Sequence, residues 1–269
     1  MKQTKNNMKN KALLVGINQY PNPNNSLRGC VNDILDMEHF IAETHKVYAK
    51  ENIKKLTDKE ATKQGIIHQI KWLLEGAAPG DQLLFHYSGH GAQAATLFPH
   101  LESDGLDEII CPYDFDGSSA TAFRDKEFAY LFANIPRGVH FVWISDSCHA
   151  EDLSRDPVSS ETLRYRYFNT PHPVSADPTG SLLANKAPVL TPLNGALLSA
   201  CGSNQLSADA IINNRFNGAF THYLIENLIE YPDKPMELIV DLVDVDLEQN
   251  GYDQNPHIEG LLQDRKFFL

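Results

Sequence analysis

The sequence predicts an α/β fold in which helices cover both faces of a mostly parallel sheet. Apolar runs that are typical of strands buried on both faces recur at 12–17, 82–87, 139–145 and 195–200. Segments with helical periodicity lie between these runs. Strands and helices therefore alternate along the chain, and this order builds parallel sheets with right-handed crossovers.

Each predicted helix follows from the spacing of its apolar residues. The segment 31–42 places Ile34, Met37 and Ile41 on one side of a helix, and 61–76 does the same with Ile66, Ile70 and its other apolar residues. Further helices are expected at 125–132, 218–229 and 236–247. The apolar C-terminal residues 265–269 are a candidate fifth strand.

Composition excludes several classes of function. The chain has 269 residues, 42% of them hydrophobic, which is ordinary for a globular protein. Its formal charge of −12 disfavours nucleic acid as a partner and favours positively charged substrates. The run 12–17 is too short for a signal peptide, and no stretch approaches the roughly 18 apolar residues of a membrane span. No membrane partner is expected.

The four cysteines are Cys30, Cys111, Cys148 and Cys201, and they form no CxxC pair. Neither a zinc ribbon nor a disulfide framework is indicated. Reduced thiols and a cytoplasmic location are therefore expected, while the oligomeric state is not predicted.

Polar residues follow two of the predicted strands at their carboxyl ends, where reactive groups gather in open α/β sheets. Strand 82–87 leads into Ser88-Gly89-His90-Gly91, and strand 139–145 leads into Asp146-Ser147-Cys148-His149. If the strands are neighbours, Ser88, His90, Asp146 and Cys148 converge on one crevice, because alternate residues of an extended segment face the same side. Imidazole near a thiol favours the thiolate, so Cys148 and His90 are a candidate catalytic dyad.

Other interpretations compete with this dyad. A single cysteine is often a small buried core residue, and His149 is an alternative base although its side chain should point away from Cys148. A metal hydrolase using His86 and His90 is a weaker alternative, because no HExxH motif is present.

Several motifs, in order, resemble those of metacaspases and of their bacterial relatives, the orthocaspases. The histidine motif reads HYSGHG (86–91) and the cysteine motif reads ISDSCHA (144–150). Further matches are KALLVGINQY, LRGCVND (27–33), ESDGLDEIICPYDFD (102–116), LLSACGSNQLSAD (197–209) and GAFTHYL (218–224).

This resemblance implies a single caspase-like peptidase domain over 1–269, with a caspase-hemoglobinase-type three-layer sandwich around a mainly parallel six-stranded sheet. A large-subunit-like part would cover 11–150 and a small-subunit-like part 193–269. The proline-rich connection 151–192 would join them, and it is long for a connection within a compact domain.

The resemblance also implies a cysteine endopeptidase that acts on proteins or peptides and cleaves after Arg or Lys. Cys148 would form a thioester with the substrate, His90 would transfer protons, and the N–H groups of Gly91 and Cys148 would bind the oxyanion. An acidic substrate pocket would include Asp33, Ser88 and Asp146. Taken alone, Asp33 would read as a solvated residue in the first turn of a helix. The rival hypothesis is a catalytically silent caspase-like binding or scaffolding domain.

Some positions depart from the family pattern or extend it. Ala150-Glu151 replaces the usual Ser-Gly after Cys148-His149, and Cys30 lies where relatives carry a second active-site cysteine. Metacaspases often bind calcium through aspartates near Asp104, Asp107 and Asp125, but Asp125-Lys126 replaces an adjacent acidic pair. No cofactor is therefore expected to be required, and calcium binding stays an open alternative. The long connection carries four candidate self-cleavage sites, namely Arg155, Arg164, Arg166 and Lys186.

Overall fold

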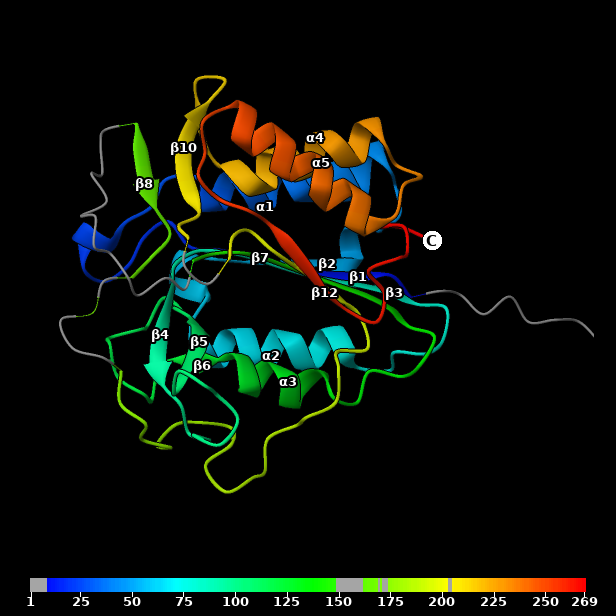
Figure 1. Cartoon of the computed structure of the whole chain (residues 1–269). Helices are drawn as coiled ribbons and strands as arrows, with labels where there is room; N and C mark the ends of the chain where they lie inside the picture. Colours follow the sequence, from blue (N-terminus) through cyan, green and yellow to red (C-terminus); the bar gives the residue numbers. More distant parts are fainter. Residues whose placement is uncertain (1–8, 149–161, 169, 171–173, 203–204) are drawn as a thin grey trace, which may run out of the picture.

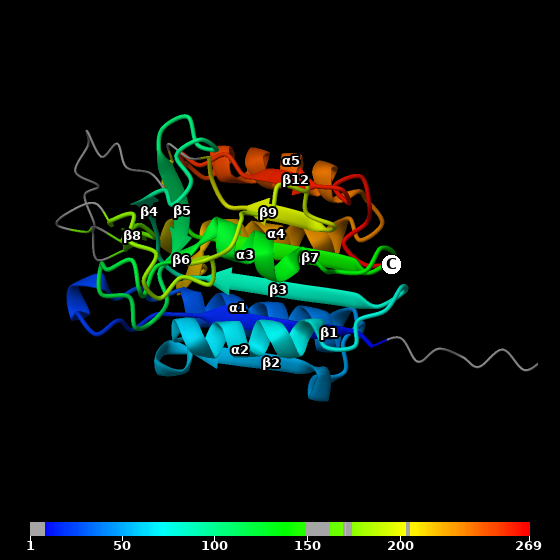
Figure 2. The same cartoon turned by 90° about the horizontal axis from the view of Figure 1, so that it is seen from below.

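The computed structural model describes residues 9–148, 162–168, 170, 174–202 and 205–269. Its centre is a six-stranded sheet with the strand order β12-β9-β7-β3-β1-β2 (Figure 2). The strands are β1 (Lys11–Gly16), β2 (Ile53–Thr57), β3 (Gln82–Ser88), β7 (His140–Asp146), β9 (Ala196–Ser199) and β12 (His257–Gly260). All neighbours pair in parallel except β12, which is antiparallel to β9. The mainly parallel sheet predicted from the sequence is confirmed.

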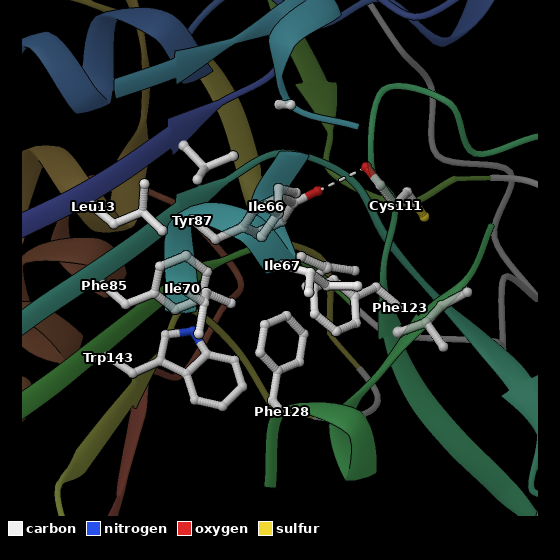
Figure 3. Packing of buried hydrophobic residues seen from close by; sticks show 14 of the residues in the cluster. Leu13, Ile66, Ile67, Ile70, Phe85, Tyr87, Cys111, Phe123, Phe128 and Trp143 are labelled. Atoms are coloured by element: carbon white, nitrogen blue, oxygen red, sulfur yellow. Dashed lines mark hydrogen bonds between the residues drawn. The ribbon is translucent and has the colours of Figure 1, made fainter. Parts of the chain in front are cut away.

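Two layers of helices enclose this sheet (Figure 1). One face carries α1 (Cys30–His39), α4 (Ala219–Glu230) and α5 (Met236–Gln249), and the other carries α2 (Lys63–Leu74) and α3 (Asp125–Phe132). Because side chains alternate along a strand, Leu13 packs in the core beneath α2 while Leu14 packs in the core beneath α1. Figure 3 shows the first of these cores, where Phe85, Phe128 and Trp143 bring three aromatic rings together.

The strand expected at 265–269 is wrong. These residues follow β12, and Lys266 makes only an isolated bridge to Pro235. Phe267 and Phe268 are buried in the core on the α1, α4 and α5 side of the sheet, where the ring of Phe268 packs against Phe40, His45 and Tyr48. Their apolar character therefore reflects core packing rather than sheet pairing.

Two small sheets, which the apolar pattern did not predict, lie at the carboxyl ends of the parallel strands (Figures 1 and 2). One has the order β4-β5-β6, with β4 at Gly91–Ala95, β5 at Leu106–Ile110 and β6 at Phe123–Arg124. The other has the order β11-β10-β8, with β11 at Arg215–Gly218, β10 at Ala208–Ile212 and β8 at Leu163–Tyr165. They therefore flank the edge of the central sheet where His90 and Cys148 emerge. Among the described residues, none of the helices combines the length with the apolar composition of a membrane span.

Candidate active site

His90 lies in the tight connection between β3 and β4. Gly89 precedes it at a position where a Cβ atom would lie 2.5 Å from the hydroxyl of Tyr87, so only glycine fits. The His90 main-chain N–H donates to the hydroxyl of Tyr20 at 3.0 Å, and its ring packs against the rings of Tyr20 and Phe168. The imidazole is thus held in one orientation.

The contacts of the His90 ring define its protonation state. Its Nε2 lies 2.7 Å from the main-chain carbonyl oxygen of Asn25, which only accepts, so Nε2 carries the proton and donates. Burial lowers the pKa of His90 to about 4, although the main-chain carbonyls of Asn25 and Arg166 act in the opposite direction. At neutral pH the ring is therefore uncharged and its buried Nδ1 has a free lone pair, because no hydrogen-bond partner for it exists among the described residues. Nδ1 is the nitrogen that could accept a proton.

Cys148 follows β7 by two residues and is fully buried. Its sulfur lies 3.8 Å from the carbonyl oxygen of Ser207. Burial raises the pKa of the Cys148 thiol, and the neighbouring thiol of Cys201 adds to this rise. The sulfur is therefore protonated at neutral pH in this state, and a partner must take its proton before it can act as a nucleophile.

A single main-chain carbonyl, that of Arg166, lies between the two predicted catalytic residues. Its oxygen accepts hydrogen bonds from the N–H of Gly91 at 2.9 Å and from the N–H of Cys148 at 3.3 Å. These are the two donors that the sequence analysis expected to bind an oxyanion. The Arg166 carbonyl also acts to raise the pKa of the His90 imidazole, against the larger effect of burial. His90, Gly91 and Cys148 therefore surround one peptide carbonyl.

The side chain of Arg166 fills a fully buried acidic pocket. Its guanidinium lies 2.6 Å from Asp33 Oδ2, 2.9 Å from Asp146 Oδ2 and 3.4 Å from Asp209 Oδ1, and it donates to Ser88 Oγ at 2.8 Å. The structure thus brings Asp33, Ser88 and Asp146 together as the sequence analysis expected. Asp209, in the quoted motif 197–209, is a third carboxylate to which no role was given.

Each carboxylate of the pocket is fixed by a second set of donors. The hydroxyl of Thr221 donates to Asp146 Oδ2 at 2.6 Å, and the N–H of Gly218 donates to Asp33 Oδ1 at 2.8 Å. The N–H of Gly29 donates to Asp209 Oδ1 at 2.7 Å. Burial raises the pKa of Asp209, although the Arg166 guanidinium opposes this effect. The three fixed carboxylates can therefore bind a planar cation that carries several hydrogen-bond donors, such as a guanidinium.

Gly218, which precedes α4, forms one wall of the pocket and was not identified from the sequence. A Cβ atom there would lie 2.4 Å from Asp146 Oδ2 and 2.6 Å from each terminal nitrogen of Arg166. The guanidinium therefore packs directly against bare backbone.

The other candidate residues have different surroundings. Cys30 is fully buried at the start of α1, where burial raises the pKa of its thiol and Arg166, Asp209 and Asp33 act on it electrostatically. It lies beside the acidic pocket. His149, Arg155, Ala150 and Glu151 lie outside the described residues.

The carboxylates near the calcium positions that the resemblance suggests surround a side-chain cation. The ammonium of Lys126 lies 2.6 Å from Asp107 Oδ1, 2.6 Å from Glu102 Oε1 and 3.2 Å from Asp125 Oδ2, so a side-chain cation already occupies this carboxylate cluster. Asp104 accepts a hydrogen bond from the main chain of Leu106. Within the described ranges, no group of three or more His, Cys, Asp or Glu residues could hold a metal ion. His86 and His90, the pair considered for a metal hydrolase, therefore belong to no such group.

Comparison with known proteins places this chain in a family. Residues 10–155 match the family model described as the metacaspase, peptidase C14 domain. The chain is 30% identical to Metacaspase-1 of Meyerozyma guilliermondii over 92% of its length, and 28% identical to Metacaspase-1 of Coccidioides immitis over 93%.

The chain spans 68% of the first of these relatives and 61% of the second. The crystal structure of protein GSU0716 from Geobacter sulfurreducens has the same fold, with a TM-score of 0.70 at 24% identity over 97% of this chain and 99% of that one. The chain therefore belongs to the metacaspase family of C14 cysteine-type peptidases.

Proposed function

We propose that the chain is an endopeptidase that cleaves after Arg or Lys, with Cys148 as nucleophile and His90 as acid and base. One observation carries this proposal: the carbonyl of Arg166 receives the N–H groups of Gly91 and Cys148 while its side chain fills the acidic pocket. This is how the residue before a cleaved bond must be held, with its carbonyl beside the nucleophile and its side chain in the specificity pocket.

The protonation states suggest how the reaction begins. The thiol of Cys148 is neutral and the His90 ring is neutral, so the thiol proton must move to Nδ1 of His90 as sulfur attacks the carbonyl carbon. The N–H groups of Gly91 and Cys148 then stabilise the oxyanion, each by about 3 kcal/mol. His90 gives the proton to the leaving amine and later draws a proton from the water that hydrolyses the thioester.

The charge of the pocket supports the preference for basic side chains. A carboxylate about 4 Å from a guanidinium gains roughly 4 kcal/mol at an effective dielectric constant near 20, before the cost of desolvation. Asp33, Asp146 and Asp209 all lie within this distance of the Arg166 guanidinium. An Asp side chain in the same place would be buried against like charge.

The test uses reporter peptides that end in Arg, Lys or Asp, on the unaltered enzyme and on Asp146→Asn. We expect Arg and Lys reporters to be cleaved at least about a hundredfold faster than Asp reporters, since a difference of only 2.7 kcal/mol gives that ratio. Asp146→Asn should lower the ratio, whereas a defect in the nucleophile would lower all three rates equally. Tight binding of Arg peptides without cleavage would instead identify a scaffolding domain.

A further inference from the structure

We propose that Tyr87 is a positioning residue for the oxyanion hole, because its hydroxyl fixes the peptide group between His90 and Gly91. This inference rests on the proposed function, in which the N–H of Gly91 binds the oxyanion. It adds a residue that acts on the reaction only through that N–H.

The geometry of one peptide group links Tyr87 to the oxyanion hole. The peptide between His90 and Gly91 is trans and planar, so its C=O and its N–H point in opposite directions. The N–H of Gly91 donates to the carbonyl of Arg166 at 2.9 Å, and this carbonyl marks the place where the oxyanion of a substrate would form. Any group that holds the carbonyl of His90 therefore also aims the N–H of Gly91.

Two donors hold the carbonyl of His90. The hydroxyl of Tyr87 donates to it at 2.7 Å, and the N–H of Cys111 donates to it at 2.9 Å. Tyr87 belongs to β3 of the central sheet, whereas Cys111 follows β5 of a small sheet. The peptide is thus fixed between two separate segments, and it cannot rotate without breaking both hydrogen bonds.

The hydroxyl of Tyr20 leaves the single proton of Tyr87 free for His90. The Tyr87 hydroxyl also lies 3.0 Å from the carbonyl of Cys111, a contact that Figure 3 marks with a dashed line. That carbonyl has another donor, because the hydroxyl of Tyr20 donates to it at 3.2 Å. Tyr20 in turn accepts the N–H of His90 at 3.0 Å. The two hydroxyls therefore hold the main chain on both sides of the His90 imidazole.

Both hydroxyls are shielded from water. Tyr87 is fully buried and Tyr20 is almost fully buried, and burial raises the pKa of each hydroxyl well above its ordinary range. They are therefore neutral donors at neutral pH, and water does not replace a hydroxyl that is removed. A buried tyrosine hydroxyl needs a partner in any fold, so the test must separate positioning of the oxyanion hole from general support of the structure.

The test compares two reactions of the same thiol in the unaltered enzyme and in Tyr87→Phe. Cleavage of an Arg reporter passes through an oxyanion, whereas alkylation of Cys148 by iodoacetamide displaces iodide and forms no oxyanion. We expect kcat for the reporter to fall about 10- to 100-fold in Tyr87→Phe. This is less than the roughly 100- to 1,000-fold cost of losing a whole oxyanion donor, because the N–H of Cys111 still holds the His90 carbonyl.

The other rates should not follow kcat. KM for the reporter and the alkylation rate of Cys148, measured by peptide mass spectrometry, should both stay within about twofold, because the lost interaction is made only in the transition state. Para-aminophenylalanine in place of Tyr87 keeps a donor at this position, so it should restore most of kcat.

Tyr48→Phe is the matched control. Tyr48 is also a buried tyrosine, but it packs against Phe268 in the core on the opposite face of the sheet. Its substitution should leave both reactions of Cys148 unchanged. Thermal unfolding of each variant gives the folded fraction, so that all rates are expressed per folded molecule.

An unchanged kcat in folded Tyr87→Phe would overturn this inference. A parallel fall in kcat and in the alkylation rate would also overturn it, as would a loss of kcat that para-aminophenylalanine does not reverse. These results would leave the proposed function standing, because the unaltered enzyme still cleaves the reporter. Failure of the unaltered enzyme to cleave any reporter would overturn both.

Discussion

Replacing Gly218 with alanine places one methyl group in the wall of the acidic pocket. The new Cβ would lie 2.4 Å from Asp146 Oδ2 and 2.6 Å from both terminal nitrogens of the arginine that fills the pocket. Contacts this short cannot persist, so the carboxylate and the guanidinium must move apart. Overpacking of this kind typically costs about 1–3 kcal/mol.

If most of this cost falls on the bound guanidinium, kcat/KM for an Arg reporter should fall about 5- to 150-fold. A Lys reporter has a narrower head group and should lose less, so the ratio of Arg to Lys cleavage should fall. The control is Gly202→Ala, because a Cβ atom there would meet only the side-chain oxygen of Gln205 at 3.4 Å. Stopped assays with both reporters, together with thermal unfolding, separate a pocket defect from a folding defect. Unchanged Arg cleavage in a folded Gly218→Ala enzyme would refute the location of the pocket.

Three further predictions concern the nucleophile, acid stability and calcium. Cys148→Ala should abolish reporter cleavage without changing the unfolding temperature, whereas Cys30→Ala should keep most activity per folded molecule; the reverse result would make Cys30 the nucleophile. Burial is the main cause that lowers the pKa of His86 from its usual 6.5 to about 4 in the folded chain. The folded state therefore has its full stability above pH 6.5, and it loses stability as the pH falls towards 4, because the unfolded chain binds the proton more readily. That loss is at most about 3 kcal/mol. The free energy of unfolding, measured in urea at a series of pH values, should therefore fall less steeply with acid for His86→Gln than for the unaltered chain, and equal slopes would contradict this. Reporter cleavage should persist in EGTA because the Lys126 ammonium already lies among the carboxylates of Glu102, Asp107 and Asp125, and dependence on added calcium would contradict this.

The sequence predicted those strands whose residues are continuously apolar, because burial on both faces leaves a clear pattern. β2 was missed because its Ile53–Thr57 residues lie at the sheet edge and only Leu56 is buried. The strands of the two small sheets at the active-site end are short, and β8 and β10 bring together residues that are far apart in sequence. Their pairing is a tertiary property that local periodicity does not encode.

The candidate site was predictable where chemistry follows directly after a strand. Ser88, His90, Asp146 and Cys148 all lie at or just beyond the ends of β3 and β7, which pair residue by residue from Gln82 with His140 to Ser88 with Asp146. Asp209 and Gly218 reach the pocket from β10 and β11, so nothing in their local sequence indicated a role. Arg166 was one of four basic residues in the connection, and only its contacts distinguish it.

Covalent trapping tests most directly whether Cys148 attacks the residue whose side chain fills the acidic pocket. A peptide chloromethyl ketone ending in Arg is incubated with the unaltered enzyme, and the labelled residue is located by peptide mass spectrometry. The same probe ending in Asp serves as the control. We expect the Arg probe to label Cys148 alone and the Asp probe to label little. Labelling of Cys30 or Cys201 in place of Cys148, or equal labelling by both probes, would contradict it.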